Sequence, residues 1–250
     1  HRDLHSFPTR RSSDLAKRAI DSGEIGNSEE SQKVIIFRAG GQTSGQGTHG
    51  RSWISGRGNM FSTAAVPFWM ITRGGGLELF PLKIAVIVHS VLKDLIVPSR
   101  KLFVKWPNDI LSDDGSKVSG SLMITHGGSC CWMLIGIGVN VMTAPRQQQF
   151  SDSFIRPATC LSEIGMKTPE LTSKEISEMV FRAIVERIVV PWKAEEILEE
   201  WSKCVDWNSQ IKRREKPGII LKAIKINKDG SLRVITPDGI EEDHIDSYLL

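Results

Sequence analysis

The apolar positions divide the chain into a long region with both helix and strand signals and a short C-terminal region with strand signals alone. Short apolar runs bounded by turn residues predict strands, and apolar positions three or four apart predict helices. We expect strands over 34–37, 60–66 and 102–106, and a hairpin formed by 118–125 and 131–141. We expect helices over 82–95, 172–190 and 193–204, and the end of a truncated helix over 16–20.

Two of these helices carry clear boundary signals. Thr172 and Glu175 have the spacing of a capping box, so a helix is expected to begin just after Thr172. Pro98 follows the apolar run of 82–95 and closes that helix, because proline cannot donate the next hydrogen bond.

The pattern changes near Lys212. The stretch 212–218 is basic and turn-prone, which is typical of a solvated linker, with a contact patch for an acidic partner as the alternative. Alternating segments over 219–226 and 232–236 follow, joined by the turn 228–231, and they predict a small β module of barrel type. We therefore expect a large domain over 16–211 and a small C-terminal domain over 212–250.

The first fifteen residues differ from the rest of the chain. The stretch 1–15 begins with His1, lacks periodicity and resembles the translation of a sequencing adapter. We treat it as a non-native segment and exclude it from the fold prediction.

The bulk composition excludes several classes of function. The chain has 250 residues, 40 % of them hydrophobic, which is enough for one full domain and a small appendage. A net charge of +3 gives no large basic excess for binding nucleic acid. The longest apolar stretch is interrupted by charged residues, and no signal peptide is legible, so neither a membrane span nor export is expected. The cysteines form no Cys-x-x-Cys pair, which favours a reduced, cytoplasmic location; they are Cys130, Cys131, Cys160 and Cys204.

A glycine-rich run precedes the second strand. Gly45, Gly47 and Gly50 allow the backbone of this loop to approach a ligand closely and to offer several N–H groups to an anion. No Gly-Lys-Ser/Thr follows, so the loop is not a P-loop. Trp53 comes directly after the loop and is suited to close over a flat ligand, although a core anchor is an equal interpretation.

The segment 105–109 is the sharpest chemical signal. Pro107 makes the turn rigid and favours extended geometry at Trp106, so Lys105 is held at the end of a strand. A fixed ammonium group can neutralise the charge that develops when a carboxylate attacks an α-phosphate. Asn108 and Asp109 are candidates for binding the nucleotide or its magnesium.

Two further segments complete the candidate site. Lys117 begins a run of small residues that permits close approach of a ligand, and Asn140 ends an apolar strand thinned by Gly136 and Gly138. Asn140 is a candidate ribose or phosphate contact. The histidines are scattered along the sequence, so we expect neither a metal cluster nor a histidine-based triad.

In this order, the motifs resemble those of the biotin–protein ligases, which activate biotin with ATP and transfer it to a carrier lysine. The resemblance extends from about Lys33 to the C-terminus. It is carried by the glycine-rich loop ending in 50–53, by 105–109, 117–122, 136–140 and 158–161, and by the C-terminal β module.

The resemblance implies an α+β fold, with a mixed sheet backed by helices and a C-terminal SH3-like barrel. It implies a reaction with ATP, accompanied by Mg²⁺, and biotin as substrate. The partner would be the biotin carrier domain of a biotin-dependent carboxylase, and a homodimer is possible, without DNA or membrane binding. Lys105 would be catalytic and would bridge the biotin carboxylate and the phosphate. The implied biotin contacts are Gln42, Gln46, Gly47, Thr48 and Lys105, and the implied adenylate contacts are Arg51, Trp53, Asn108, Asp109, Lys117 and Asn140.

The sequence departs from the family pattern in two places. The family loop usually carries arginines where this chain has Gln46, Thr48 and His49, which predicts weaker retention of the adenylate. The family's Ser-Thr-Asn biotin element is expected upstream, where this chain has the suspect segment containing Ser12, Ser13 and Asp14.

Three functions remain open at this stage. The leading interpretation is a biotin–protein ligase without an N-terminal DNA-binding domain, since no helix-turn-helix precedes the catalytic region. A lipoate ligase of the same superfamily is the alternative enzyme, and the pair Trp106-Pro107 favours biotin. A protein that holds biotin or its adenylate without turnover would be of a different class.

Overall fold

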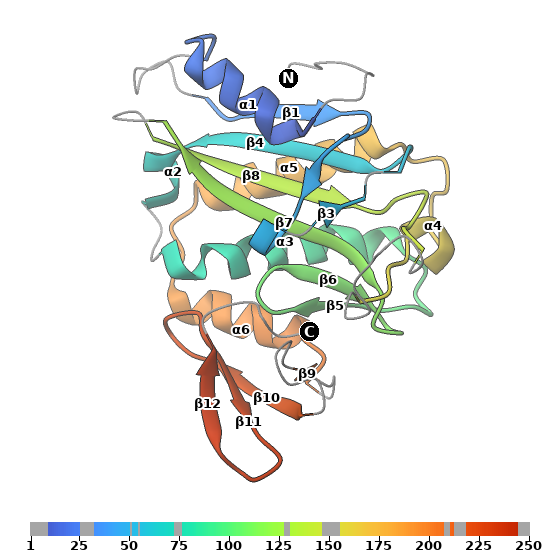
Figure 1. Cartoon of the computed structure of the whole chain (residues 1–250), viewed down its shortest axis with the longest axis vertical. Helices are drawn as coiled ribbons and strands as arrows, with labels where there is room; N and C mark the ends of the chain where they lie inside the picture. The colour runs from blue at the N-terminus through green and yellow to red at the C-terminus, as the bar shows by residue number, and fades with distance from the viewer. Residues whose placement is uncertain are drawn as a thin grey trace.

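The structure, a computed structural model, consists of a large antiparallel sheet between two helical layers, with a smaller sheet at the C-terminal end (Figure 1). It describes residues 10–25, 33–50, 52–54, 56–72, 77–127, 131–146, 156–207, 211–212 and 219–244.

The large sheet has six strands in the order β1-β4-β8-β7-β6-β5. These strands are β1 (Ile35–Ala39), β4 (Met60–Pro67), β5 (Leu102–Lys105), β6 (Asp109–Ser112), β7 (Lys117–His126) and β8 (Trp132–Val139). Every ladder between them is antiparallel. The expected mixed sheet is therefore corrected to an antiparallel one. The physical reason is that β5 to β8 follow one another through short hairpin connections, each of which reverses the chain direction.

Both faces of this sheet are covered, and β4 shows why. All eight residues of β4 are buried, and alternate side chains belong to different apolar clusters. Ala64 and Val66 pack on the side of α3 (Phe80–Leu95) and α5 (Ser173–Ile188), while Ala65 packs on the side of α1 (Ser12–Asp21). A strand buried on both faces reads as a continuous apolar run rather than an alternating one.

The main helices lie close to their predicted positions. α3 extends the expected helix toward the N-terminus, with a proline in its first turn, where the missing N–H costs little. α5 begins directly after the capping box of Thr172 and Glu175, in which both reciprocal hydrogen bonds form. The remaining helices are α2 (Phe68–Thr72), α4 (Leu161–Ile164) and α6 (Ala194–Cys204), with 3-10 turns η1 (Thr48–Gly50) and η2 (Leu77–Leu79). Among the helices described, none has the length and apolar character needed to cross a bilayer.

The N-terminal helix is longer than the sequence indicated. The stretch 16–20 was expected to be the end of a helix, and α1 runs from Ser12 to Asp21, so it includes the last residues of the excluded segment 1–15. Ser12 is buried, and its hydroxyl lies 2.8 Å from the hydroxyl of Thr63 on β4. Ala16, Ala19 and Ile20 then pack over the sheet.

The C-terminal strands form a second antiparallel sheet in the order β12-β11-β10-β9. They are β9 (Ile211–Lys212), β10 (Ile220–Ile226), β11 (Leu232–Ile235) and β12 (Glu241–His244). The predicted hairpin around 228–231 is present as the β10–β11 pair. Within the described residues the sheet is open, so the predicted SH3-like barrel is not confirmed.

A turn of this small sheet contacts the large one. The indole Nε1 of Trp106 donates a hydrogen bond to the carbonyl of Gly230, at 2.9 Å. Gly230 has φ +81°, and a Cβ there would lie 2.9 Å from the carbonyl oxygen of Glu78. Only glycine satisfies both the backbone angle and the close approach. The C-terminal sheet is therefore seated on the segment that also carries Asn108 and Asp109.

Candidate functional site

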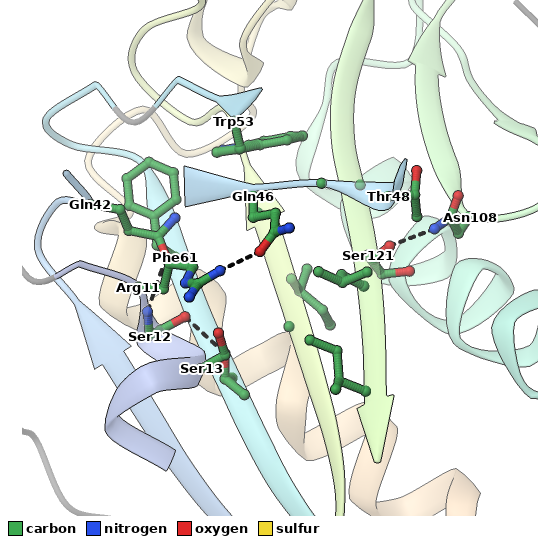
Figure 2. Close-up of a pocket in the computed structure, with 18 of the residues that line it drawn as sticks. Arg11, Ser12, Ser13, Gln42, Gln46, Thr48, Trp53, Phe61, Asn108 and Ser121 are labelled. Atoms are coloured by element: carbon green, nitrogen blue, oxygen red, sulfur yellow. Dashed lines mark hydrogen bonds between the residues drawn. The ribbon is translucent and has the colours of Figure 1, made fainter. Parts of the chain in front are cut away.

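A cleft lies on the face of the large sheet that is formed by β4, β7 and β8 (Figure 2). It contains about 690 Å³ of empty space, a volume that includes open solvent at its mouth. Strand side chains form its floor, the glycine-rich segment covers it, and the start of α1 closes one end. The lining residues are Arg11, Ser12, Ser13, Gln42, Gln46, Gly47, Thr48, Trp53, Phe61, Thr63, Asn108, Asp109, Lys117, Gly120, Ser121, Leu122, Ile124, Leu134, Gly136, Ile137 and Gly138.

The glycine-rich segment forms a small hairpin over the cleft. β2 (Gly45–Gln46) pairs with β3 (Ser52–Trp53), and η1 forms the connection between them. The hairpin presents Gln46, Gly47 and Thr48 to the cleft, as the sequence predicted for biotin contacts. Gly50 has φ +70°, a conformation that favours glycine. Arg51, a predicted adenylate contact, and the side chain of His49 lie outside the described residues.

Trp53 rests on a bare part of the sheet. A Cβ built on Gly138 would lie 2.8 Å from two carbon atoms of the Trp53 indole. The missing side chain of Gly138 therefore makes room for the ring. The Nζ of Lys117 lies 5.3 Å from the ring centroid, in cation–π range. Trp53 and Lys117, both implied as adenylate contacts by the family resemblance, thus lie next to each other.

Lys117 and Asp109 form an ion pair inside the cleft. Nζ of Lys117 and Oδ1 of Asp109 are 2.7 Å apart, and the two side chains are 25 % and 16 % exposed. Gly120 flanks the pair, since a Cβ there would lie 3.1 Å from both atoms. A lysine paired in this way is held in place and is still open to an incoming anion. This geometry can neutralise charge on a phosphate or carboxylate.

Asn108 and Ser121 join the turn after β5 to β7. The Nδ2 of Asn108 donates to the carbonyl of Ser121, and the Ser121 N–H donates back to the Asn108 carbonyl at 3.2 Å. The Ser121 hydroxyl is buried and has no hydrogen-bond partner within the described part of the chain. Because a buried unpaired hydroxyl is costly, it is a candidate contact for a bound molecule.

The glutamines at the other end of the cleft are held by the N-terminal end of α1 and its capping residue Arg11. The backbone N–H of Ser12 donates to Oε1 of Gln42 at 3.0 Å, and a guanidinium nitrogen of Arg11 donates to Oε1 of Gln46 (Figure 2). Both glutamines were predicted as biotin contacts, and both line the cleft.

Two predicted site residues do not line this cleft. Lys105 ends β5 and instead lines a second cleft, next to the C-terminal sheet. Within the segment 105–109, the side chains that line the first cleft are those of Asn108 and Asp109, which come after Lys105. Asn140 is buried, and its Nδ2 donates to the carbonyl oxygens of Thr159 at 3.1 Å and Lys117 at 3.3 Å. Asn140 therefore braces the start of β7.

Sequence reasoning missed most of the cleft floor. Phe61 and Thr63 come from β4, Leu122 and Ile124 from β7, and Leu134 from β8. These residues read as ordinary strand core, and only the neighbouring glycines of β8 indicated that something packs against the bare backbone. No group of three or more potential metal-ligating side chains occurs among the residues that the structure describes.

The fold and the site together define an α+β protein with a small-molecule cleft that combines a glycine-rich cover, an aromatic ring and a fixed cation. The chain belongs to the biotin/lipoate A/B protein ligase family, whose model matches residues 16–140.

Individual relatives agree with this assignment. A biotin–[acetyl-CoA-carboxylase] ligase of Paracoccus denitrificans is 30 % identical over 128 residues, which cover 50 % of this chain and 51 % of that protein. The chain thus spans about half the length of this relative. The fold resembles that of the Leishmania major biotin protein ligase in complex with biotin, with a TM-score of 0.67, 23 % identity and coverage of 95 % and 96 % of the two chains. It also resembles the Aquifex aeolicus biotin protein ligase in complex with biotin and ATP, with a TM-score of 0.67, 21 % identity and coverage of 97 % and 95 %.

Proposed function

We propose that the chain is an ATP-dependent biotin–protein ligase, which forms biotinyl-5'-AMP and transfers the biotin to a lysine of a biotin carrier domain. One observation carries this proposal: a single cleft holds the Lys117–Asp109 pair, Trp53 and the glycine-rich hairpin. The names of the relatives, with biotin or with biotin and ATP bound, supply the substrate identities.

The reaction has two steps. A carboxylate oxygen of biotin attacks the α-phosphorus of ATP, the bond to the β-phosphate oxygen breaks, and pyrophosphate leaves. The amine of the carrier lysine then attacks the acyl carbon, loses a proton and releases AMP. The first step brings two negatively charged groups together, and the second develops negative charge on the acyl oxygen and on the departing phosphate. Catalysis therefore comes from positioning and from a cation at the reacting oxygens.

In this mechanism Lys117 takes the role that the sequence motif suggested for Lys105. Lys117 is the lysine that lines the cleft and is oriented by Asp109. Gln42, Gln46, Gly47 and Thr48 would contact biotin. Trp53, Asn108, Asp109 and Arg51 would contact the adenylate, and Asn140 would act through Lys117.

The wider assignments are also proposals. Mg²⁺ would enter with ATP, near Asp109, which is the carboxylate of the cleft. The partner would be the carrier domain of a biotin-dependent carboxylase, in the cytoplasm, with no DNA or membrane involved and with a possible homodimer. The C-terminal sheet would belong to an SH3-like domain over 212–250, after a catalytic domain over 16–211.

We also propose that the segment 1–15 is foreign to the natural protein. This proposal rests on the resemblance of the segment to a translated adapter. Sequencing the gene upstream of the codon for Ala16 tests it, and recovery of the same fifteen codons from genomic DNA would refute it.

The enzyme assignment is tested by mixing the chain with ATP, biotin and a biotin carrier domain. We expect pyrophosphate release with biotin and covalent labelling of the carrier. Stronger pyrophosphate release with lipoate would favour a lipoate ligase. Biotin binding without pyrophosphate release would instead indicate a binding protein, and both outcomes would refute the proposal.

A further inference from the structure

A second cleft lies where the large sheet, α6 and the C-terminal sheet meet; we call it the junction cleft. It encloses about 650 Å³ of empty space, part of it open to solvent. It is lined by Phe103, Val104, Lys105, Trp106, Leu111, Ser112, Asp113, Gly115, Arg156, Trp201, Val205, Asp206, Ile211, Ala223 and Leu232. It shares none of these residues with the first cleft.

The walls of the junction cleft are mostly apolar and well fixed. Trp201 is fully buried, and Val104, Leu232 and Trp106 are nearly so. These side chains come from α6, β5, β11 and the turn after β5, so three parts of the fold build one surface. A rigid apolar wall of this kind fits a flat or acyl body on a ligand.

The charged side chains that line the junction cleft balance in sign. Two cations, Lys105 and Arg156, and two carboxylates, Asp113 and Asp206, line it. Arg100 does not line the cleft, but its guanidinium donates to both carboxylate oxygens of Asp113, at 2.8 Å or less. One of the two carboxylates that line the junction cleft is thus already paired with a residue outside it.

Among the cations of the junction cleft, Arg156 has hydrogen-bond donors that can still bind a ligand. Its one hydrogen bond runs from Nη1 to the carbonyl of Gly115, at 3.1 Å, and it has no ion pair within the described residues. Burial lowers the pKa of the guanidinium, and the charge of Asp109 opposes that shift. A guanidinium has five N–H donors and a geometry that matches carboxylate and sulfonate oxygens.

We infer that the junction cleft is a second ligand site, which takes a small organic anion: a carboxylate or sulfonate attached to an apolar body. The anionic group would pair with Arg156, and the apolar body would lie against Trp106 and Leu232. This site is separate from the cleft proposed for biotin and ATP, and it does not require that function.

The test is a calorimetric titration of the whole chain with octanoate and with octan-1-ol, in the presence of excess biotin. Biotin blocks the first cleft, where an acyl carboxylate could also bind. We expect one octanoate per chain. Arg156→Gln should weaken octanoate binding about tenfold or more, because a hydrogen bond to a charged group is lost. The same substitution should leave octanol binding unchanged.

Two further variants complete the design. Arg182→Gln removes an exposed cation on α5, away from the junction cleft, and should leave octanoate affinity unchanged. Ala223→Leu fills the cleft from the C-terminal sheet and should weaken both probes, which keeps the proposal testable if Arg156→Gln fails to fold. Equal octanoate affinity in the wild type and in either cleft variant would overturn the inference. The inference would also be overturned if excess biotin, or the Lys117→Gln substitution, abolished octanoate binding. In that case octanoate would be bound in the first cleft.

Discussion

Replacing Lys117 by glutamine is expected to abolish most of the adenylate-forming activity, whereas the same change at Lys105 is expected to have little effect. Lys117 lines the first cleft and lies 2.7 Å from Asp109, while Lys105 lines the junction cleft. The pair is a matched test because both lysines lie close to Asp109 in sequence and the substitution is identical. The sequence motif alone favoured the opposite result.

The expected magnitude follows from the role of the ammonium group. Removing one preorganised donor from a developing oxyanion typically costs about 10²–10³ in kcat, or roughly 2.7–4 kcal/mol. Lys117→Gln should fall in this range, and Lys105→Gln should stay within about threefold of the wild type. Loss of the ion pair with Asp109 should lower stability by only about 1 kcal/mol, because both side chains are partly exposed to solvent.

The assay is biotin-dependent exchange of labelled pyrophosphate into ATP, which measures adenylate formation without a carrier protein. Thermal unfolding of both variants provides the control for folding, and a shift of about 2–4 °C corresponds to about 1 kcal/mol in a chain of this size. Full exchange activity in Lys117→Gln, or a hundredfold loss in Lys105→Gln, would refute the assignment made from the cleft.

Three other variants test parts of the fold and the site. Gly138→Ala should displace the Trp53 ring, which its Cβ would approach to 2.8 Å, and raise the KM for ATP about tenfold, or about 1.4 kcal/mol. The control Gly136→Ala, whose Cβ meets nothing closer than 3.5 Å, should leave the KM for ATP unchanged. Lys83→Met should raise stability by about 1–2 kcal/mol at pH 7, because burial lowers the pKa of this lysine to about 8 and its Nζ has no hydrogen-bond partner among the described residues. That advantage should shrink between pH 8 and about 10.4, because in this range the folded wild type has lost a proton that the unfolded chain still binds. A difference in Tm between variant and wild type that stays constant across this range would contradict the reasoning. Thr172→Ala should cost about 1 kcal/mol in urea unfolding by removing the cap of α5, and a loss below about 0.3 kcal/mol would show that the cap contributes little.

Local signals in the sequence predicted the elements well but predicted their assembly less well. The capping box at Thr172 and the turn around Gly230 act over a few residues, so α5 and the β10–β11 hairpin lie where they were expected. Which side of a hairpin faces a ligand depends on packing between distant segments. For this reason, nothing near Lys105 in the sequence shows that it lies beside the C-terminal sheet.

The same limit explains the outcome for Asn140. An amide at the end of a glycine-containing strand looks like a ligand contact when it is read alone. In the folded chain it donates to the carbonyls of Lys117 and Thr159, which lie in segments far apart in the sequence. The structure reveals this brace, and the ligand contact of Asn140 stays a prediction, because its buried Oδ1 has no hydrogen-bond partner among the described residues.

The contact of Gly230 with Glu78 and Trp106 restricts which C-terminal sheets could be joined to the large domain of this protein. An exchange of the C-terminal strands with those of a relative would succeed only if the incoming turn also brings a glycine with positive φ and a carbonyl within reach of the indole. A graft with any other residue at that position would push the turn outward and leave the Trp106 N–H without an acceptor. The C-terminal strands should therefore be exchangeable only together with the segments around Glu78 and Trp106 that they contact.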